Sequence, residues 1–412
     1  MRRCRVSGIM LVICILTLSI AGCDWHRGVK KPEFEKDTST NVLTSVDNTT
    51  EYTEKVTTDE QIDEEQTTYD TITPPEEVEW VVKLLHSMTI EEKVGQMFIA
   101  RCPASNAASL ATQYALGGYI LFAEDFKGKS VEQVKEDISS YQDASKINMF
   151  IGVDEEGGKV NRVSKYKEFR DEPFMSSQSL YADGGYERIK LDTIEKSRML
   201  KNLGINLNFA PVADVSIDSS DYIYNRTFGL GAKETSIYVR TVVEIMNQEK
   251  MGSVLKHFPG YGGNMDTHEG IAYDDRLYES FLSSDFLPFE AGIDAGAGIV
   301  MVAHNIVYSL DEQYPASLSA KVHKILREDL GFEGVIITDE LSMEGVKQFA
   351  SDDEVAVLAV QAGNDLLCCT NFEVQIQAVV DAVKQGKISE EQINESVLRI
   401  LRLKYSLGII SE

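Results

Sequence analysis

From about residue 76 to the end of the chain, short apolar runs alternate with longer stretches in which apolar residues recur at helical spacing. Apolar runs of strand length that lack polar alternation are typical of parallel strands, because both faces of such strands are buried. Eight such runs predict eight strands, at residues 96–100, 118–122, 150–153, 207–210, 253–255, 298–302, 334–338 and 365–367. The pattern therefore predicts a mainly parallel sheet.

The stretches between these runs predict helices, at residues 131–144, 185–203, 235–250, 320–330 and 373–385. Thr89 is placed to cap an early helix, and Ser389 to cap the last one. Alternating strands and helices predict an α/β fold, and eight such units favour a TIM-type (β/α)8 barrel. Residues 76–412 form the predicted domain. A doubly wound open sheet is the alternative.

The first residues have the features of a bacterial targeting signal. Three arginines precede the apolar stretch 9–20, which is too short to cross a bilayer comfortably. Ile20-Ala21-Gly22-Cys23 then resembles a lipobox, so residues 1–22 are predicted to be a signal peptide and Cys23 the lipidated first residue. The expected location is extracytoplasmic, anchored by lipid to the cell membrane. An ordinary signal peptide or an uncleaved anchor is the alternative.

Residues 23–75 are rich in Thr, Glu, Asp and Ser and have no sustained apolar period. Such a segment cannot bury enough apolar surface to fold, so it is predicted to be a disordered tether. The whole chain carries a net charge of −26, which argues against a nucleic-acid partner. The cysteines beyond residue 100 form neither a disulfide framework nor a zinc-type spacing.

Polar or charged residues follow five predicted strands, and another pair begins the eighth. In a barrel, the carboxyl ends of the strands carry the active site, so these side chains are expected to line one polar pocket for a hydroxylated substrate. They are Asp154, Glu155, Glu156 and, further on, Arg162; Asp214 and Arg226; Lys256 and His257; His304 and Asn305; Asp339 and Glu340; and Asn364 and Asp365.

The segment 256–268 is the strongest candidate for a catalytic loop, since it leaves a strand and runs through a Pro/Gly-rich stretch to Asp266 and His268. A carboxylate beside an imidazole sets the tautomer of the ring and raises its pKa, which suits proton transfer near neutral pH. Asp339 directly follows an apolar strand, whose rigidity would hold a nucleophile in place. The residues thus predict a retaining glycosidase in which His268 is the acid/base.

These motifs resemble glycoside hydrolase family 3, in particular its β-N-acetylglucosaminidase (β-N-acetylhexosaminidase) branch. The likeness rests on the loop 256–268, on the stretch 151–158 with Arg162, and on Thr338-Asp339-Glu340-Leu341-Ser342-Met343. It implies that the protein removes terminal N-acetylglucosamine from peptidoglycan-derived cell-wall glycans or from related glycans. It also implies a covalent intermediate on Asp339 and an acid/base dyad of Asp266 and His268.

The same resemblance implies that five residues bind the hydroxyl groups of the sugar, and that neither a metal nor an organic cofactor is needed. These residues are Asp154, Arg162, Arg226, Lys256 and His257. The chain departs from the branch at Tyr261, where a second histidine is usual in the loop. We expect this change to alter loop packing or a contact with the leaving group, with activity retained.

Several other functions are compatible with parts of the pattern. A zinc-dependent barrel hydrolase could in principle use His257, His268 and His304 with Asp339, but no His-x-His follows the first strand. A β-glucosidase or a phosphorylase of the same family would share most of the site residues. A non-catalytic glycan-binding lipoprotein would not need a nucleophile opposite an Asp-His dyad. The protein is expected to act as a monomer on a glycan substrate.

Overall fold

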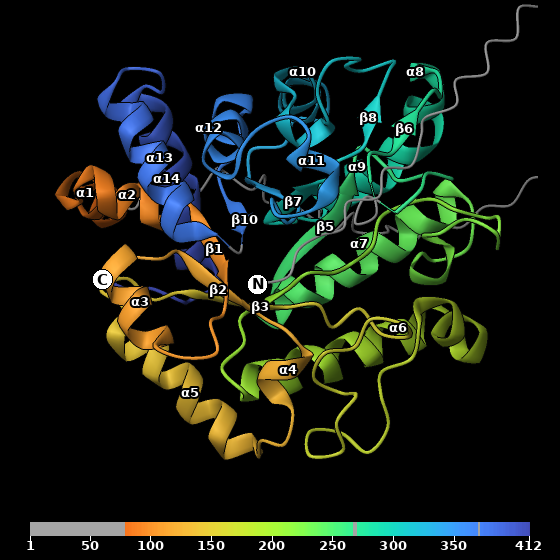
Figure 1. The fold of residues 1–412 in the computed structure, drawn as a ribbon. Helices are drawn as coiled ribbons and strands as arrows, with labels where there is room; N and C mark the ends of the chain where they lie inside the picture. Colours follow the sequence, from red (N-terminus) through yellow and green to blue (C-terminus); the bar gives the residue numbers. More distant parts are fainter. Residues whose placement is uncertain (1–78, 267–269, 370) are drawn as a thin grey trace, which may run out of the picture. The chain divides into compact units, whose positions relative to one another are not determined.

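The structure is a computed structural model, and it describes residues 79–266, 270–369 and 371–412. The predicted signal peptide (1–22), the tether (23–75), Cys23 and His268 lie outside these residues. Eight parallel strands form one sheet (Figure 1). They are β1 (Phe98–Arg101), β2 (Gly118–Leu121), β3 (Phe150–Val153), β4 (Leu207–Asn208), β5 (Gly252–Phe258), β7 (Ile299–Val302), β9 (Val335–Thr338) and β10 (Leu367–Cys369).

The sheet closes on itself to form a barrel. Its strand order is β10-β1-β2-β3-β4-β5-β7-β9, and a parallel bridge between Ile337 and Leu366 joins the two ends. The Thr338 amide donates to the Leu366 carbonyl at 3.1 Å, and the Asp365 amide donates to the Ile336 carbonyl at 2.8 Å. The predicted (β/α)8 barrel is therefore confirmed, and an open doubly wound sheet is excluded because the first and last strands of the eight-stranded sheet are bridged to each other.

Helices lie around the outside of the barrel (Figure 1). The longer ones are α1 (Glu79–Ser87), α2 (Ile90–Gln96), α3 (Ala107–Tyr114), α5 (Val131–Ala144), α6 (Ser177–Asn202), α7 (Ala232–Gln248), α9 (Phe286–Asp294), α12 (Asp352–Ala362), α13 (Phe372–Lys384) and α14 (Glu390–Ser406). The shorter ones are α4 (Ala123–Phe126), η1 (Tyr224–Arg226), α8 (Tyr278–Ser280), η2 (Phe281–Asp285), η3 (Ala316–Leu318), α10 (Ala320–Lys324), η4 (Ile325–Asp329) and α11 (Glu344–Lys347). In the described part of the chain, no helix has the length and apolarity to cross a membrane.

The predicted helix starts are confirmed where the caps can be checked. Thr89 accepts from the Glu92 amide at the start of α2 and forms a full capping box with it. Ser389 accepts from the Gln392 amide at the start of α14. The predicted helix 320–330 is instead two short elements, α10 and the π-helical turn η4, because its backbone shifts to i→i+5 hydrogen bonds after Lys324.

The sheet differs from the sequence-based expectation in the bounds of several strands and in one additional sheet. Strand β1 starts at Phe98 and not at residue 96, because Gln96 ends helix α2; β4 ends at Asn208 and not at residue 210; and β10 covers Leu367–Cys369 and not 365–367. Strand β5 continues to Phe258, three residues beyond its predicted end, since Lys256 and His257 find charged partners inside the barrel mouth. A separate two-stranded sheet, β6 (Tyr273–Asp274) with β8 (Ile306–Val307), was not predicted. Strands of two residues are too short to produce a detectable hydrophobic period.

A fully buried lysine lies at the amino end of the barrel. Lys404 of α14 donates to Gln96 Oε1 at 2.7 Å, and its Nζ lies 5.1 Å from the centre of the Phe150 ring. Burial lowers the pKa of Lys404 to about 7, well below the ordinary value of a lysine. The folded protein therefore binds this proton less readily than the unfolded chain does.

This lowered pKa predicts a pH-dependent loss of stability. As the pH falls from about 10.4 to about 7, the unfolded chain takes up the proton first, so the free energy of unfolding should fall by up to about 1.4 kcal/mol per pH unit from this group. We expect Lys404→Met to remove this slope and to be more stable than the wild type at pH 7, as measured by urea unfolding. Lys384→Met, at an exposed ion pair with Glu91, is the control and should change little. An unchanged slope in Lys404→Met would contradict the prediction.

Candidate active site

Four charged side chains meet between the carboxyl ends of β3 and β5, and we call them the four-charge cluster: Asp154, Glu156, Arg226 and Lys256. Lys256 Nζ lies 2.6 Å from Asp154 Oδ1 and 2.7 Å from Glu156 Oε1. Arg226 binds both carboxylate oxygens of Glu156, at 3.0 and 2.7 Å. The cluster pairs two cations with two carboxylates, so burial leaves no formal charge uncompensated.

Each charged group in the cluster stabilises the ionised form of its partners. Burial alone would raise the pKa of the Glu156 carboxyl, but Arg226 and Lys256 outweigh that effect and hold the pKa well below its usual range. Burial opposes the charge of Lys256 too, and Asp154 and Glu156 raise its pKa above the ordinary value. Asp154 keeps 16% of its side chain exposed, against 2% for Lys256. Asp154 is therefore the carboxylate of the cluster that is best placed to accept a hydrogen bond from a hydroxyl group of a ligand.

His257 connects the cluster to a buried carboxylate, Asp214. The ring Nδ1 lies 2.8 Å from Asp214 Oδ2, and Nε2 lies 3.3 Å from Arg226 Nη2. An arginine can only donate, so Nε2 is the acceptor and the proton sits on Nδ1, which donates to Asp214. Asp214 also accepts the backbone amides of His257 and Tyr261, at 3.0 and 2.7 Å. One carboxylate thus orients the ring and holds the start of the catalytic loop.

The sequence placed Asp214 and Glu156 at strand ends but did not include either among the site residues. The structure shows that both hold residues that were included: Glu156 binds Arg226 and Lys256, and Asp214 binds His257. Their position directly after a predicted strand was the available signal. This signal could not show that Asp214 and Glu156 matter more than other strand-end residues, because their partners come from other parts of the chain.

Asp214→Asn tests this positioning role. The asparagine amide would turn an NH2 group toward an N–H group that now donates to the Asp214 carboxylate. We therefore expect His257 to lose its orientation and kcat/KM to fall by roughly 10- to 1,000-fold. Asp218→Asn is the matched control, because Asp218 belongs to the same connection and is exposed, and its carboxylate binds Ser220. A lower melting temperature with unchanged kcat/KM would show that Asp214 only supports the fold.

Arg162 is carried on a loop that Glu155 holds in place. Glu155 is fully buried, and its carboxylate accepts the amides of Arg162 and Val163 at 2.8 Å each, as well as the amide and hydroxyl of Ser164. The Arg162 guanidinium carbon lies 5.6 Å from the centre of the Phe122 ring, and its Nε is a buried donor without a hydrogen-bond partner in the described structure. Glu155 is therefore a structural carboxylate that fixes the backbone carrying Arg162.

Asp339 follows β9, on the opposite side of the barrel mouth from Asp154, because β9 and β3 are four positions apart in the closed ring of eight strands. Its amide donates to the Val302 carbonyl at 3.0 Å, which extends the pairing of β9 with β7. Asp339 Oδ1 accepts the Glu340 amide at 2.8 Å. The residue is partly exposed. Asp339 thus stands at the end of a paired strand, and its role as nucleophile stays a prediction.

His304 supports this strand end from β7. Its Nε2 lies 3.0 Å from the Glu340 carbonyl and its Nδ1 lies 2.7 Å from Ser317 Oγ. A carbonyl can only accept, so Nε2 carries the proton and Nδ1 accepts from the serine hydroxyl. Both ring nitrogens are therefore engaged within the protein. This geometry does not favour His304 as a zinc ligand, the role that the metal-dependent alternative gave it.

Asp266 lies in the described part of the catalytic loop, and its predicted partner His268 does not. Burial, together with a hydrogen bond to Asp266, raises the pKa of Tyr222 to about 12. Tyr261 lies beside Tyr222 and is 3% exposed. The centre of its ring lies 6.0 Å from the ring centre of Tyr222 and 5.6 Å from that of His257. The tyrosine that departs from the family pattern thus packs in the wall of the site. The predicted pairing of Asp266 with His268 stays a prediction.

A second set of charges holds the middle of the catalytic loop. Arg276 donates to the Gly260 carbonyl at 3.1 Å and binds the carboxylates of Asp274 and Asp285. Gly260 has φ of +121°, and a Cβ there would overlap with the Asp285 carboxylate. Burial raises the pKa of Asp285 to about 6, although Arg276 opposes this shift. The loop backbone is therefore packed directly against a salt-bridged support.

Comparison with known proteins agrees with this arrangement. The family model described as "Glycosyl hydrolase family 3 N terminal domain" matches residues 89–403, which is most of the chain. The chain belongs to glycoside hydrolase family 3. The match confirms the resemblance to this family that the motifs indicate.

Individual relatives of the family 3 chain include two proteins named beta-hexosaminidase. The one from Pseudoalteromonas piscicida is 30% identical over 73% of this chain and 55% of its own length, so this chain spans about half of that relative. The one from Idiomarina loihiensis is 35% identical over 65% of this chain and 80% of its own length. A solved family 3 β-N-acetylglucosaminidase from Paenibacillus is 29% identical, with a TM-score of 0.73 over 79% of this chain and 64% of its own.

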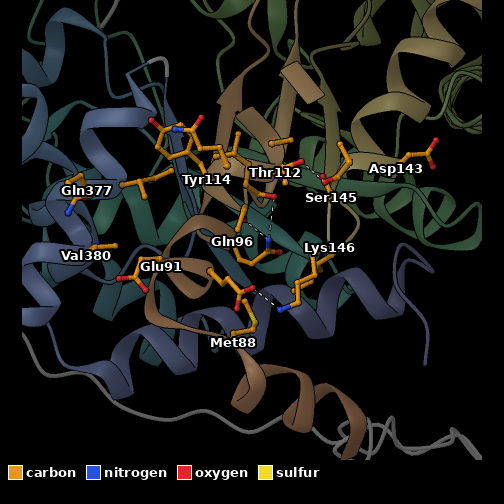
Figure 2. Close-up of a pocket in the computed structure, with 18 residues that line it drawn as sticks. Met88, Glu91, Gln96, Thr112, Tyr114, Asp143, Ser145, Lys146, Gln377 and Val380 are labelled. Atoms are coloured by element: carbon orange, nitrogen blue, oxygen red, sulfur yellow. Dashed lines mark hydrogen bonds and ion pairs between the residues drawn. The ribbon is translucent and has the colours of Figure 1, made fainter. Parts of the chain in front are cut away.

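A cavity of about 600 Å³ lies at the other end of the barrel of this family 3 domain, near the amino ends of β1, β2 and β3 (Figure 2). Gln96, Thr112 and Tyr114 lie on one side of it, and the ion pair of Lys146 with Glu92 lies on another. Active sites of barrel enzymes form at the carboxyl ends of the strands, so this cavity is not the catalytic site.

Proposed function

We propose that the protein is a retaining, exo-acting β-N-acetylhexosaminidase that removes terminal N-acetylglucosamine from cell-wall glycans. The observation that carries the proposal is the four-charge cluster, which stands across the barrel mouth from Asp339. A dense set of fixed donors and acceptors suits the hydroxyl groups of one terminal sugar, and a strand-end carboxylate suits attack at its anomeric carbon. The names of the relatives support N-acetylglucosamine as that sugar.

In the proposed first step, Asp339 attacks the anomeric carbon while the bond from that carbon to the leaving oxygen breaks. His268 gives its proton to the leaving oxygen, so the released group departs as a neutral alcohol. In the second step, water loses a proton to His268 and attacks the same carbon, which releases Asp339. Two inversions give overall retention of configuration.

Asp154, Arg162, Arg226, Lys256 and His257 are proposed to form the subsite that holds the terminal sugar during these steps. The tautomer of His257 leaves no free ring nitrogen in the absence of a sugar, because Asp214 and Arg226 occupy both. We therefore expect Asp154 and Lys256 to make the direct hydroxyl contacts and His257 to hold Arg226. Fixed charges of this kind need little reorganisation when the transition state forms.

The decisive experiment compares the nitrophenyl β-glycosides of N-acetylglucosamine and of glucose, with and without phosphate. We expect release of nitrophenol from the first substrate to be much faster, independent of phosphate, and accompanied by the β-anomer as first product in proton NMR. Preference for the glucoside would indicate a β-glucosidase, and a requirement for phosphate a phosphorylase. No turnover of either, with binding retained, would indicate the non-catalytic glycan-binding lipoprotein.

We further propose that the mature protein is attached to the membrane through a lipid on Cys23, on the basis of the lipobox-like Ile20-Ala21-Gly22-Cys23. One acyl chain binds a bilayer weakly, whereas a diacylated cysteine gives stable attachment. We expect the protein in the membrane fraction, labelled by radioactive palmitate, and Cys23→Ala to lose both properties. If Cys23→Ala fractionates like the wild type, the lipoprotein proposal is wrong.

A further inference from the structure

Two exposed tyrosines form a stacked pair on the small sheet that the sequence did not predict. Tyr273 belongs to β6, and Tyr308 directly follows β8. Their ring centres are 5.8 Å apart and the ring planes differ by 13°, yet 54% and 50% of these two residues stay exposed. Large rings that remain half exposed while held in a fixed relation are typical of a binding surface.

The backbone beneath the pair is rigid. Strands β6 and β8 pair Tyr273 with Ile306 and Asp274 with Val307. The Ile306 amide donates to the Ala272 carbonyl and the Tyr308 amide to the Asp274 carbonyl, both at 2.9 Å. A ligand that stacks on these rings would therefore lose little to ordering them, because the rings are already placed.

The tyrosine pair is connected to the catalytic loop through Asp274. This residue is 2% exposed, and its carboxylate accepts from Asn264 at 2.8 Å and from Arg276 at 2.7 Å. Arg276 in turn holds the Gly260 carbonyl, and Asn264 itself belongs to the loop. The pair and the catalytic loop are thus parts of one hydrogen-bonded unit.

Asp274, next to Tyr273, holds the loop that carries the proposed acid/base, because its carboxylate accepts from Asn264 of that loop. The acid/base must touch the glycosidic oxygen, and the group that departs begins at that oxygen. The four-charge cluster instead follows β3 and β5 and the turn η1, so it suits the terminal sugar.

We propose that Tyr273 and Tyr308 form a subsite that binds a sugar ring of the leaving group by stacking. The inference rests on the proposed glycosidase function and adds to it a preference for saccharide leaving groups. The faces of a pyranose ring carry C–H groups, which pack on an aromatic ring, while its hydroxyl groups at the edge stay in water. A half-exposed tyrosine pair matches this chemistry.

The test compares two substrates that differ by one sugar ring: diacetylchitobiose, whose leaving group is a sugar, and methyl N-acetyl-β-glucosaminide, whose leaving group is methanol. We expect Tyr273→Ala and Tyr308→Ala each to lower kcat/KM for the disaccharide roughly 5- to 10-fold and to leave that for the methyl glycoside unchanged. Tyr273→Phe should behave as the wild type, since it keeps the ring. Tyr405→Ala, at a 40% exposed tyrosine of α14, is the control.

Equal losses of kcat/KM on both substrates would overturn the inference, because the tyrosines would then act through the loop. Unchanged kcat/KM on both substrates would overturn it too. Failure of the wild type to release N-acetylglucosamine from either substrate would refute the proposed function. In that case, titration calorimetry with chitotriose still tests the subsite. An unchanged Kd in Tyr273→Ala and Tyr308→Ala would overturn the inference, and a 5- to 10-fold weaker Kd would support it.

Discussion

Asp339→Ala is expected to lower kcat/KM on the order of 10⁴-fold or more, the largest effect of any single substitution in this protein. Without the carboxylate, no covalent intermediate can form, and water would have to attack the anomeric carbon directly, with only the proposed acid/base His268 to assist it. The fold should persist, because Asp339 is partly exposed at a strand end and its amide, which pairs with Val302, is unchanged. The measurement is steady-state kinetics on the chromogenic N-acetylglucosaminide, with a melting curve.

Two controls sharpen this result. Glu340→Gln changes the neighbouring acid, which contacts the Ser342 amide, and should lower kcat/KM by less than roughly 10-fold. A fluorinated N-acetylglucosaminyl fluoride, which forms the intermediate but releases it slowly, should label Asp339 in a peptide digest. A label on Glu340 or Glu155 would show that the nucleophile has been assigned to the wrong residue.

His268→Ala is expected to have the second largest effect, and the effect should depend on the leaving group. Natural glycans need protonation of a poor leaving oxygen, so their turnover should fall by roughly 10²- to 10⁴-fold. An activated phenol needs little protonation, so its first step should be nearly retained. The second step still lacks its base, and the glycosyl-enzyme should accumulate as a burst of phenol followed by a slow steady rate.

Asp266→Ala provides the graded comparison. If Asp266 orients the imidazole, its loss should give a weaker form of the same pattern, through misorientation and a lower pKa of the ring. Tyr222→Phe removes the hydroxyl that binds Asp266 and should change the rates less than Asp266→Ala does. Equal losses of His268→Ala on good and poor leaving groups, with no burst, would mean that this histidine only shapes the pocket.

The strands of the barrel were predictable because their signal is local. Residues 150–153, for example, form β3 with the predicted bounds, since a run of buried apolar residues is visible without knowledge of its neighbours. Caps such as Thr89 are equally local, because donor and acceptor lie three residues apart. The end of β5 was not predictable in this way, because its last residues include ionisable side chains.

Lys256 and His257 can continue a buried strand only because other strands supply their counter-charges. Asp154 and Glu156 follow β3, and Asp214 follows β4, between about 40 and 100 residues earlier in the chain. Nothing in the local pattern shows which carboxylate will meet which cation, since that depends on the order and register of strands around the barrel. The roles of Asp214 and Glu156 therefore emerged only from the structure.

The sequence by itself determined the eight strands, the family resemblance and the candidate nucleophile, because apolar period and strand-end position are properties of short segments. The tertiary structure decided which charges pair in the four-charge cluster, which tautomer His257 adopts, and that Arg276 holds Gly260. It also brought Tyr273 beside Tyr308. These contacts join residues that are not neighbours in the chain, and they depend on the order and register of the folded elements, which no local pattern shows.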